Sequence, residues 1–552
     1  MAEEWKRLRI PKGRDDFKEL REDGFYFVDK SELISDIIQN GSKVFLFTRP
    51  RRFGKSLNLS MLDAFFNIKY KGNTWFDRLK VNDHPEVEEH RNAYPVIRLS
   101  MNDLDYLDYD EFISDFKDRI KDLYKGYRYL ENSEKMDPAD RKEYQRVVND
   151  KADPTLLKKS LYALCSMLEQ YHGVKPIILI DEYDATLNYA YGRETYNKIL
   201  STFRSFYSLA LKGNESLTFA VVTGVMQIAK EGIFSGLNNL DVNNIFGTRF
   251  DERYGFTESE VKELCSYYGH PEKFDEVKEW YDGYRFGDAE VYNPWSVMSC
   301  ILEKFSTGAY WAGTSGNSII DTLIENSNEK TFKDLHALSN GETVLKPLVP
   351  TVAMEDLKIE PSAVFSVFAV SGYLKAIPAG QDYLLSIPNR EMYSAFYKHL
   401  KRFMFHGGPD PFAPFLDALE AGNTTKIKET LDTFFQNFSF FLLKEEGYYH
   451  AILAVMILSR EGKYTILIDR ETGDGRHDIF MKSRFPRYPN IVVEIKKADS
   501  EASDATVQHL AQKALDQIHE KDYCRGLEGR TFLYGIAFRA KTATVLFEET
   551  VI

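Results

Sequence analysis

The sequence predicts an α/β protein built in three parts. Over the first 254 residues, apolar runs that suit buried strands alternate with helical patterns, which is typical of a three-layer domain around a parallel sheet. Aromatic-rich helical segments follow, and three strand-like runs flanked by helices then indicate a second α/β domain. We therefore expect domains over residues 1–254, 255–430 and 431–552.

The composition narrows the classes of protein that are expected. With 552 residues, the chain is long enough for several hydrophobic cores. The stretch MAEEWKRLRIPKG lacks the apolar core of a signal peptide, and no run reaches the roughly 18 apolar residues of a membrane span. Four widely spaced cysteines fit a reducing cytoplasm, without a disulfide framework or a zinc site. The net charge of −13 argues against a protein that coats nucleic acid, but it allows a local nucleic-acid site beside bound metal.

The first candidate motif lies between the apolar run 43–47 and an amphipathic helix that begins near Ser56. Gly54, Lys55 and Ser56 match the end of the pattern G-x-x-x-x-G-K-[ST], whereas Arg49 stands in place of its opening glycine. A junction from strand to helix suits a phosphate, because free N–H groups and the positive end of the helix dipole are concentrated there. The alternative is a basic turn on the surface.

A second motif supplies carboxylates. In KPIILIDEYDATL (175–187), Asp181 and Glu182 follow four apolar residues, at the point where a strand should end. An aspartate in this position can hold magnesium, and the adjacent glutamate can orient or deprotonate a water molecule. The alternative is that DEYD only solvates the end of the strand.

Two further apolar runs, 94–101 and 217–224, complete the predicted parallel sheet. The second run contains Thr223, whose hydroxyl can sense a γ-phosphate. Ligands of such sheets bind at the carboxyl ends of the strands, so Lys55, Asp181 and Thr223 should converge there. The charged segment 103–153 is expected to be a solvated helical insertion.

The region from residue 255 to about 400 is expected to form a mostly helical lid. Thr257 and Glu260 form a capping box, which marks the start of a helix. A small winged element is expected near 371–389. The many aromatic residues are interpreted as core and packing residues rather than as platforms for base stacking.

The C-terminal part carries the second candidate chemistry. Segment 463–499 predicts three strands, with a hairpin turn at 473–475. Glu494 and Lys496 share one face of their strand, and Asp478 can lie opposite Glu494 on the preceding strand. Two converging carboxylates can bind a hard divalent cation, and the lysine can position water or offset the charge of a phosphate. A structural ion pair of Lys496 with either acid is the alternative.

Helices are expected on both sides of this second sheet. The first of these helices is expected over residues 440–459, where Glu446 and His450 lie on one side at i,i+4 spacing. Glu446 can reach the metal, whereas His450 is equally well explained by packing. The second helix is expected over residues 505–521. Its residues Lys513 and Gln517 are either contacts to a phosphate backbone or ordinary surface residues.

These motifs together carry a family resemblance. The N-terminal half resembles the AAA-ATPase-like family of bacterial and archaeal proteins, through the stretches DDFKELREDGFYFVDKSELI, RPRRFGKSL, IILIDEYD, GFTESEV, WYDGY and VYNPWS. The family tolerates arginine at the first glycine of the loop, although Arg49, Arg51 and Arg52 predict a more basic loop than usual. The C-terminal part is similar to the PD-(D/E)XK nuclease superfamily, in the variant fused behind such ATPases, although His477 stands where that motif has proline.

The resemblance implies a P-loop NTPase sandwich, a helical and winged-helix middle region, and a restriction-endonuclease-like domain. In the first domain, Lys55 would contact the β- and γ-phosphates of ATP, Ser56 and Asp181 would hold Mg²⁺, and Glu182 would act on water. Arg249 is a candidate arginine finger. The residues expected to bind the nucleotide are Arg52, Phe53, Gly54, Lys55, Ser56, Asp181 and Thr223.

In the second domain, the resemblance implies a nuclease centre formed by Asp478, Glu494 and Lys496, with Glu446 as a fourth candidate. Mg²⁺ would be held by Asp478, Glu494 and Glu446. Lys496 would be the catalytic lysine.

The expected protein is therefore a cytoplasmic ATPase fused to a metal-dependent nuclease, which acts on nucleic acid in a role such as defence against foreign DNA. The expected partner is nucleic acid, DNA more than RNA. No membrane partner is expected, and a homo-oligomer is possible. Two other classes stay open: a signalling switch in which the nuclease-like domain only binds a partner, and a scaffold that binds nucleotide without hydrolysing it.

Overall fold

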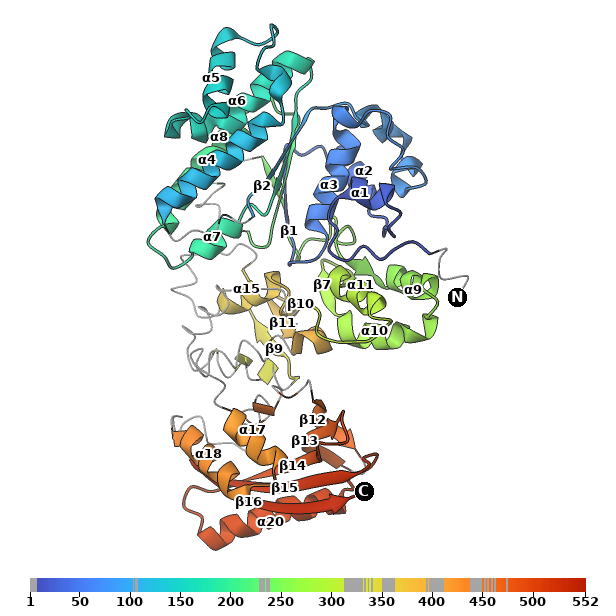
Figure 1. Ribbon diagram of the computed structural model, residues 1–552, viewed down its shortest axis with the longest axis vertical. Helices are drawn as coiled ribbons and strands as arrows, with labels where there is room; N and C mark the ends of the chain where they lie inside the picture. The colour runs from blue at the N-terminus through green and yellow to red at the C-terminus, as the bar shows by residue number, and fades with distance from the viewer. Residues whose placement is uncertain are drawn as a thin grey trace. The chain divides into compact units, whose positions relative to one another are not determined.

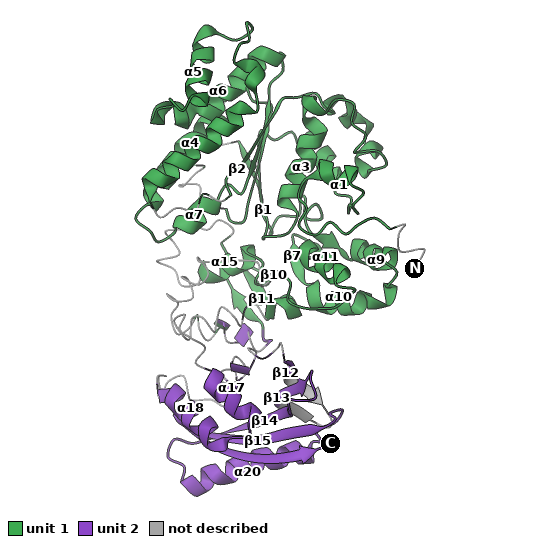
Figure 2. Ribbon diagram, viewed as in Figure 1, with its two compact units in different colours: residues 1–334, 343–395 green, residues 335–342, 396–552 purple. Residues whose placement is uncertain are grey.

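The computed structural model describes residues 7–102, 108–227, 239–311, 341–349, 363–393, 412–436, 463–472 and 475–552, and single positions between these ranges. The chain divides into two compact units (Figure 2). Unit 1 comprises residues 1–334 and 343–395, and unit 2 comprises 335–342 and 396–552. The expected domain boundary at residue 254 lies inside unit 1. Among the described residues, no helix combines the length and the apolar character needed to cross a bilayer.

Unit 1 is built around a parallel sheet of five strands in the order β2-β3-β4-β1-β5. The strands are β1 (Val44–Thr48), β2 (Val96–Ser100), β3 (Ile177–Asp181), β4 (Ala220–Gly224) and β5 (Leu240–Asn243). The expected apolar runs form the first four strands. The edge strand β5 was not predicted, because its sequence LDVN is short and only half apolar.

Helices cover both faces of this sheet, as expected for three layers. They are α1 (Phe17–Glu22), α2 (Glu32–Asn40), α3 (Lys55–Phe66), α4 (Tyr109–Lys125), α5 (Pro138–Val148), α6 (Pro154–His172), α7 (Ala185–Ala190) and α8 (Tyr196–Leu211). Figure 1 shows α1, α2 and α3 on one side of the sheet and α4, α5, α6 and α8 on the other. Short 3₁₀ turns occur at η2 (Ile68–Tyr70), η3 (Lys80–Asp83), η4 (Pro85–His90), η5 (Arg128–Leu130) and η6 (Pro271–Lys273).

The charged insertion after β2 is helical, as predicted, and contains α4 and α5. One side of α4 is nevertheless buried, through Phe112, Phe116, Ile120 and Tyr124. The rings of Phe112 and Phe116 meet Phe203 of α8 edge-on. The insertion is therefore part of the packed layer and exposes only its polar face.

The next segment contains β6 (Phe256–Thr257), α9 (Glu258–Tyr267), α10 (Phe274–Tyr281), β7 (Tyr284–Phe286), β8 (Ala289–Tyr292) and α11 (Pro294–Leu302). The capping box of Thr257 and Glu260 is confirmed at the start of α9. The β7–β8 hairpin was not predicted. It depends on a distant contact, because a Cβ on Gly283, which has a φ of 92°, would lie 2.2 Å from the carbonyl oxygen of Pro388.

A small antiparallel sheet in the order β10-β11-β9 follows in unit 1. It consists of β9 (Val344–Lys346), β10 (Lys375–Ala379) and β11 (Asp382–Ser386), and α15 (Ala363–Val370) precedes its hairpin. Segment 371–389, where a small winged element is expected, contains the antiparallel pair β10 and β11. Residues 364–370 of α15 are buried, so this helix packs inside the unit along its whole length.

Unit 2 is a five-stranded sheet in the order β12-β13-β14-β15-β16, in which only β14 and β15 are parallel. The strands are β12 (Tyr464–Thr472), β13 (Gly475–Ser483), β14 (Asn490–Ala498), β15 (Arg530–Arg539) and β16 (Thr542–Val551). The three strands predicted in 463–499 are confirmed. Residues 473 and 474 of the expected hairpin turn lie outside the described residues.

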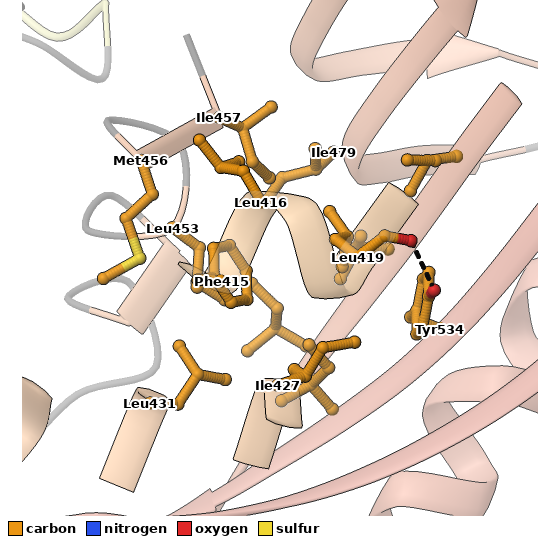
Figure 3. Packing of buried hydrophobic residues seen from close by; sticks show 14 of the residues in the cluster. Phe415, Leu416, Leu419, Ile427, Leu431, Leu453, Met456, Ile457, Ile479 and Tyr534 are labelled. Atoms are coloured by element: carbon orange, nitrogen blue, oxygen red, sulfur yellow. Dashed lines mark hydrogen bonds between the residues drawn. The ribbon is translucent and has the colours of Figure 1, made fainter. Parts of the chain in front are cut away.

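Helices cover both faces of the second sheet as well. These are α17 (Ala413–Glu420) and α18 (Thr424–Gln436) on one face and α20 (Asp504–Glu520) on the other (Figure 1). Figure 3 shows the core under α17 and α18, where Tyr534 donates a hydrogen bond from its hydroxyl to the carbonyl oxygen of Leu419, at 2.7 Å. Since alternate residues of β13 and β14 point to opposite faces, the other set faces α20.

One buried carboxylate, that of Glu391, connects α11 to the segment that follows it in unit 1. Glu391 has no exposed surface and accepts hydrogen bonds from Ser296 Oγ on α11, at 2.6 Å, and from the backbone N–H of Trp311, at 2.5 Å. Burial raises the pKa of Glu391 to about 7. Between pH 4.5 and about pH 7, Glu391 is therefore protonated in the folded state but ionised in the unfolded chain.

We expect this group to make unit 1 less stable as the pH rises. A raised carboxyl pKa contributes stability below the unfolded value of 4.5, and this contribution, up to about 3 kcal/mol, is lost as the pH passes through about 7. All the tryptophans, at positions 5, 75, 280, 295 and 311, belong to unit 1, so their fluorescence reports its unfolding alone. The thermal midpoint should fall more steeply between about pH 5 and pH 8 in the wild type than in Glu391→Gln. Equal slopes would contradict the assignment, and the exposed Glu303→Gln should behave like the wild type.

Candidate functional site

The loop between β1 and α3 leads from a buried strand to the N-terminus of a helix, a setting that suits a bound phosphate. Gly54 is the N-cap of α3 and has a φ of 84°, a left-handed conformation that glycine adopts without strain. Arg52, two residues before Gly54, also has a left-handed backbone, with a φ of 69°. Across the sheet edge, Glu182 has a φ of 51°. Strained backbone of this kind persists where the surrounding structure holds it, and it is concentrated at functional sites.

Lys55 is the first residue of α3, directly after this loop, and is 6% exposed. Its ammonium donates to the carbonyl oxygens of Arg49, at 3.0 Å, and Pro50, at 2.9 Å. Burial lowers the pKa of Lys55, while the charges of Glu182 and Asp181 raise it. A cation held by neutral carbonyls can exchange them for phosphate oxygens, which carry more charge.

Arg49 does not make the loop more basic, contrary to the expectation from the sequence. Its side chain is fully buried and donates to the carbonyl oxygens of Thr48 (2.9 Å), Asn243 (2.7 Å) and Phe250 (3.3 Å). The guanidinium also lies 5.1 Å from the ring centre of Tyr254. Burial lowers its pKa to about 10. Arg49 therefore anchors the loop to β5 and the segment after it.

The acid pair stands at the end of β3, as predicted. Asp181 is 8% exposed and accepts a hydrogen bond from Thr223 Oγ1, at 2.6 Å. Glu182 is half-buried, and burial raises its pKa while the charge of Lys55 opposes this effect. Thr223 is fully buried, and its hydroxyl points to the aspartate rather than into the cavity described below. In this geometry the threonine orients Asp181.

The second half of the DEYD motif has a role that the sequence reasoning missed. Asp184 is 1% exposed and accepts hydrogen bonds from the backbone N–H groups of Val225 (3.1 Å) and Met226 (2.8 Å). Tyr183 donates from its hydroxyl to the carbonyl oxygen of Met226, at 2.7 Å. Between them there is no room for a side chain on Gly224, whose Cβ would lie 2.5 Å from Asp184. Together these residues clamp the end of β4 to the end of β3.

The loop and the acids open into one cavity of about 590 Å³, a size typical of small-molecule sites. Its charged lining is mainly cationic although the protein has a net charge of −13: Lys12, Arg14, Lys30, Arg51, Arg52, Lys55 and Arg253 face Asp15, Asp181 and Glu182. Apolar and aromatic side chains also line the cavity, among them Tyr26, Phe27, Val28, Phe256, Trp295 and Met298. Cations with an apolar wall fit a nucleoside polyphosphate. Ser56 and Asp181, both lining residues, offer the oxygen ligands that Mg²⁺ prefers.

In unit 2, the structure brings Asp478 and Glu494 together. The ladder between β13 and β14 pairs Ile479 with Val493, so each acid lies one position beyond that pair. Asp478 Oδ2 accepts a hydrogen bond from the N–H of Ile495, at 2.7 Å. Both acids therefore lie at the position on adjacent strands that the alternating pattern predicted.

Glu494 is 2% exposed, yet its carboxylate is only partly satisfied. Its Oε1 accepts hydrogen bonds from Lys496 Nζ, at 2.9 Å, and from the side chain of Gln517 on α20. Its Oε2 is buried and has no hydrogen-bond partner among the described residues. Burial and the charge of Asp478 raise the pKa of Glu494 to about 7, while Lys496 opposes this effect. A divalent cation would satisfy both the orphan oxygen and the paired negative charge.

The surroundings of this pair include a residue that the sequence left ambiguous. His450 Nε2 lies 3.0 Å from the carbonyl oxygen of Asp478 and 3.8 Å from its Oδ1. Glu446, the fourth candidate, lies outside the described residues. Within the described ranges, no three His, Cys, Asp or Glu side chains are grouped closely enough to form a complete ligand set. The described part of the centre is therefore the pair of carboxylates.

The two α20 residues singled out from the sequence differ in their environment. Lys513 is exposed. Gln517 is half-buried and donates both to Glu494 and to the hydroxyl of Tyr523, the latter at 3.1 Å. Gln517 thus contacts the acid centre directly. Tyr523, which the sequence did not single out, reaches this centre through its hydrogen bond with Gln517.

Comparison with known proteins agrees with this geometry. Residues 11–234 match the family model AAA-ATPase-like, described as a predicted AAA-ATPase, and residues 444–548 match the model of the PD-(D/E)XK nuclease superfamily. The chain is also similar to an uncharacterized protein in the vnfD 5′ region of Azotobacter chroococcum mcd 1, with 26% identity over 398 residues that cover 70% of this chain and 68% of that protein. The protein therefore carries an AAA-ATPase-like domain in residues 11–234 and a PD-(D/E)XK nuclease superfamily domain in residues 444–548.

Proposed function

We propose that the protein binds and hydrolyses ATP in unit 1 and cleaves nucleic acid, with DNA as the substrate, in unit 2. The observation that carries the ATPase is the cationic cavity in which Lys55 and Ser56 stand opposite Asp181 and Glu182. The nuclease rests on the orphan oxygen of Glu494 beside a second carboxylate. A cytoplasmic role such as defence against foreign DNA belongs to the same proposal.

In the ATPase site, each residue has a distinct task. Lys55 exchanges the carbonyls of its own loop for the β- and γ-phosphates, and the first N–H groups of α3 donate to phosphate oxygens. Ser56 and Asp181 would hold Mg²⁺, which neutralises phosphate charge when it is bound. Glu182 takes a proton from the attacking water, and its burial favours the protonated product.

In the nuclease centre, Asp478 and Glu494 would hold a divalent cation, which stabilises charge on the phosphodiester and activates water when it is bound. Cation binding requires Glu494 to be ionised. Lys496, now paired with Glu494 at 2.9 Å, is placed to offset charge on the phosphate or to position water. Gln517 holds the Glu494 carboxylate in place.

A specific observation also favours the second candidate, an ATP-driven switch or scaffold with a nuclease-like domain that only binds a partner. The contact between Lys496 and Glu494 is a formed ion pair, which by itself serves as a structural element. The two candidates differ in whether metal-dependent cleavage occurs, so variants of this centre distinguish them.

For nucleotide binding, we expect ATP with Mg²⁺ to raise the thermal midpoint of unit 1, followed by tryptophan fluorescence. Ligand at about 100 times its dissociation constant adds roughly 2.7 kcal/mol to the stability of the state that binds it. Lys55→Ala should abolish the shift, because it removes the buried cation of the loop. The exposed Lys71→Ala is the matched control and should keep the shift. An unchanged midpoint in the wild type at millimolar ATP would contradict nucleotide binding.

For hydrolysis, Glu182→Gln should retain the ATP-induced shift but lose turnover by roughly 10²–10⁴-fold, because a positioned base contributes that much. Asp181→Asn should weaken the Mg²⁺-dependent part of binding as well. Phosphate release measures turnover, and the exposed Glu194→Gln serves as control. Wild-type turnover in Glu182→Gln would remove this residue as the base.

For the nuclease, the wild type should cut plasmid DNA with Mg²⁺ or Mn²⁺, and EDTA should stop the reaction. Asp478→Ala and Glu494→Ala should each abolish cleavage, because either change opens the metal shell. Lys496→Ala should slow cleavage but keep metal binding, measured as a metal-induced rise in melting temperature. Lys497→Ala is the control, since this lysine points to the opposite face of β14.

The structural alternative predicts a different pattern for the same variants. Lys496→Ala would then leave Glu494 buried without its cationic partner and lower stability by a few kcal/mol. No variant would show metal-dependent cleavage. This result would leave the ATPase in place and assign unit 2 to partner binding.

A further inference from the structure

The arginines of the phosphate loop lie in three different environments. Arg49 is fully buried behind the loop, where backbone carbonyls hold it. Arg52 is exposed, with its guanidinium 4.1 Å from the ring centre of Trp295. Arg51 is half-buried and lines the cavity. Only the last of these combines partial burial with direct access to the cavity.

Arg51 lies on the side of the cavity where hydrolysis is proposed to occur. Its charge contributes to the electrostatic environment of both Lys55 and Glu182, although burial is the main cause of the shifted pKa of each group. Lys55 marks the position of the β- and γ-phosphates and Glu182 that of the attacking water. Arg51, Lys55 and Glu182 line the same cavity, so in the proposed site the guanidinium shares the space into which the γ-phosphate would extend.

The backbone around Arg51 is held in place. Its carbonyl oxygen accepts a hydrogen bond from Trp311 Nε1, at 3.2 Å. The preceding Pro50 has a restricted φ, and its ring packs against Gly372, where an added Cβ would lie 2.9 Å from Pro50 Cβ. A fixed backbone limits the positions that the Arg51 side chain can take, and charged groups placed before the reaction stabilise developing charge at a low cost of reorganisation. The segment after Arg51 is held by the helix start at Lys55.

The arginine suggested from the sequence as a finger lies elsewhere. Arg249 forms an ion pair with Asp241 and is 57% exposed. It is not among the residues that line the cavity. In this structure the finger role therefore has a better placed candidate inside the loop itself.

We propose that Arg51 is a catalytic residue of the ATPase and acts within its own chain, in place of an arginine finger from a second copy. This inference rests on the proposed ATP hydrolysis. Its substrate group is the γ-phosphate, and its contribution is charge stabilisation, worth about 10³-fold or more in kcat for arginines in this role. The guanidinium stays protonated throughout.

The reaction balances as follows. The water oxygen forms a bond to the γ-phosphorus, and the bond from that phosphorus to the β–γ bridging oxygen breaks, with its electron pair leaving on ADP. One water proton passes to Glu182 and is later released. The products are ADP and inorganic phosphate. Arg51 donates hydrogen bonds to the γ-phosphate oxygens and to the bridging oxygen, on which negative charge increases.

The test compares steady-state kinetics of the full chain with binding of ADP plus aluminium fluoride, a mimic of the transferred phosphoryl group. Arg51→Ala should lose kcat by about 10³-fold, with KM for ATP changed by only a few fold. It should bind ADP normally but no longer bind ADP with aluminium fluoride. Arg51→Lys should recover part of the rate, because a point charge replaces the fork. Arg204→Ala, an exposed change on α8, is the control.

Oligomer-dependent catalysis gives a different result. If Arg51 acts within its chain, turnover per chain should stay constant over a roughly hundredfold dilution, and Arg249→Ala should keep the wild-type rate. Turnover that falls on dilution, or is lost in Arg249→Ala, would overturn the inference in favour of a finger from a second copy. So would an Arg51→Ala variant that folds normally by tryptophan fluorescence and keeps its kcat. A wild type that binds ATP without any hydrolysis would instead overturn the ATPase proposal, and this inference with it.

Discussion

The carboxyl edge of the parallel sheet in unit 1 must hold charged side chains out of water, and the rest of the site depends on how this is done. Arg49, Lys55, Asp181 and Asp184 are each less than 9% exposed. Burying such groups is costly unless they are hydrogen-bonded. Backbone carbonyls accept hydrogen bonds from the two cations. Asp184 accepts hydrogen bonds from backbone N–H groups, and Asp181 accepts one from Thr223. These bonds fix the loop, β3 and β4 relative to one another before any ligand binds.

In unit 2, the buried charged side chains are hydrogen-bonded less completely than in unit 1. Among the residues that the structure describes, Glu494 has hydrogen-bond partners on one oxygen only, and the second carboxylate lies on the neighbouring strand. Burying a carboxylate with an unpaired oxygen costs free energy. A bound cation would offset this cost, because it would neutralise both acids and interact with the unpaired oxygen. Burial and the charge of Asp478 raise the pKa of Glu494, and perturbed groups of this kind are concentrated at functional sites.

The segments from residue 255 to residue 334 and from 343 to 395 belong to the same compact unit as the parallel sheet and contact the loop before α3. Trp311 holds the carbonyl of Arg51, Gly372 packs against Pro50, and Glu391 joins α11 to the backbone of Trp311. The helix α11 in turn brings Trp295 and Met298 to the cavity wall. A change in the conformation of the loop before α3 would therefore alter its contacts with Trp295 of α11 and with Gly372, which precedes β10. Buried contacts of this kind are the physical means by which a local change spreads through a domain.

The sequence by itself determined the first four strands of the parallel sheet, the three strands β12 to β14, the positions of the loop before α3 and of the acid pairs, and the strand face on which Asp478 and Glu494 lie. These features follow from short patterns: apolar runs, the period of two in strands, and the glycine and capping residues at element ends. Tertiary structure alone decided that Arg49 turns into the core, that Thr223 orients Asp181, and that Gln517 reaches Glu494. It also decided the edge strand β5 and the β7–β8 hairpin, which depend on contacts between distant segments. Local patterns specify an element and its faces, whereas the partner that a buried polar group finds depends on what the rest of the chain places beside it.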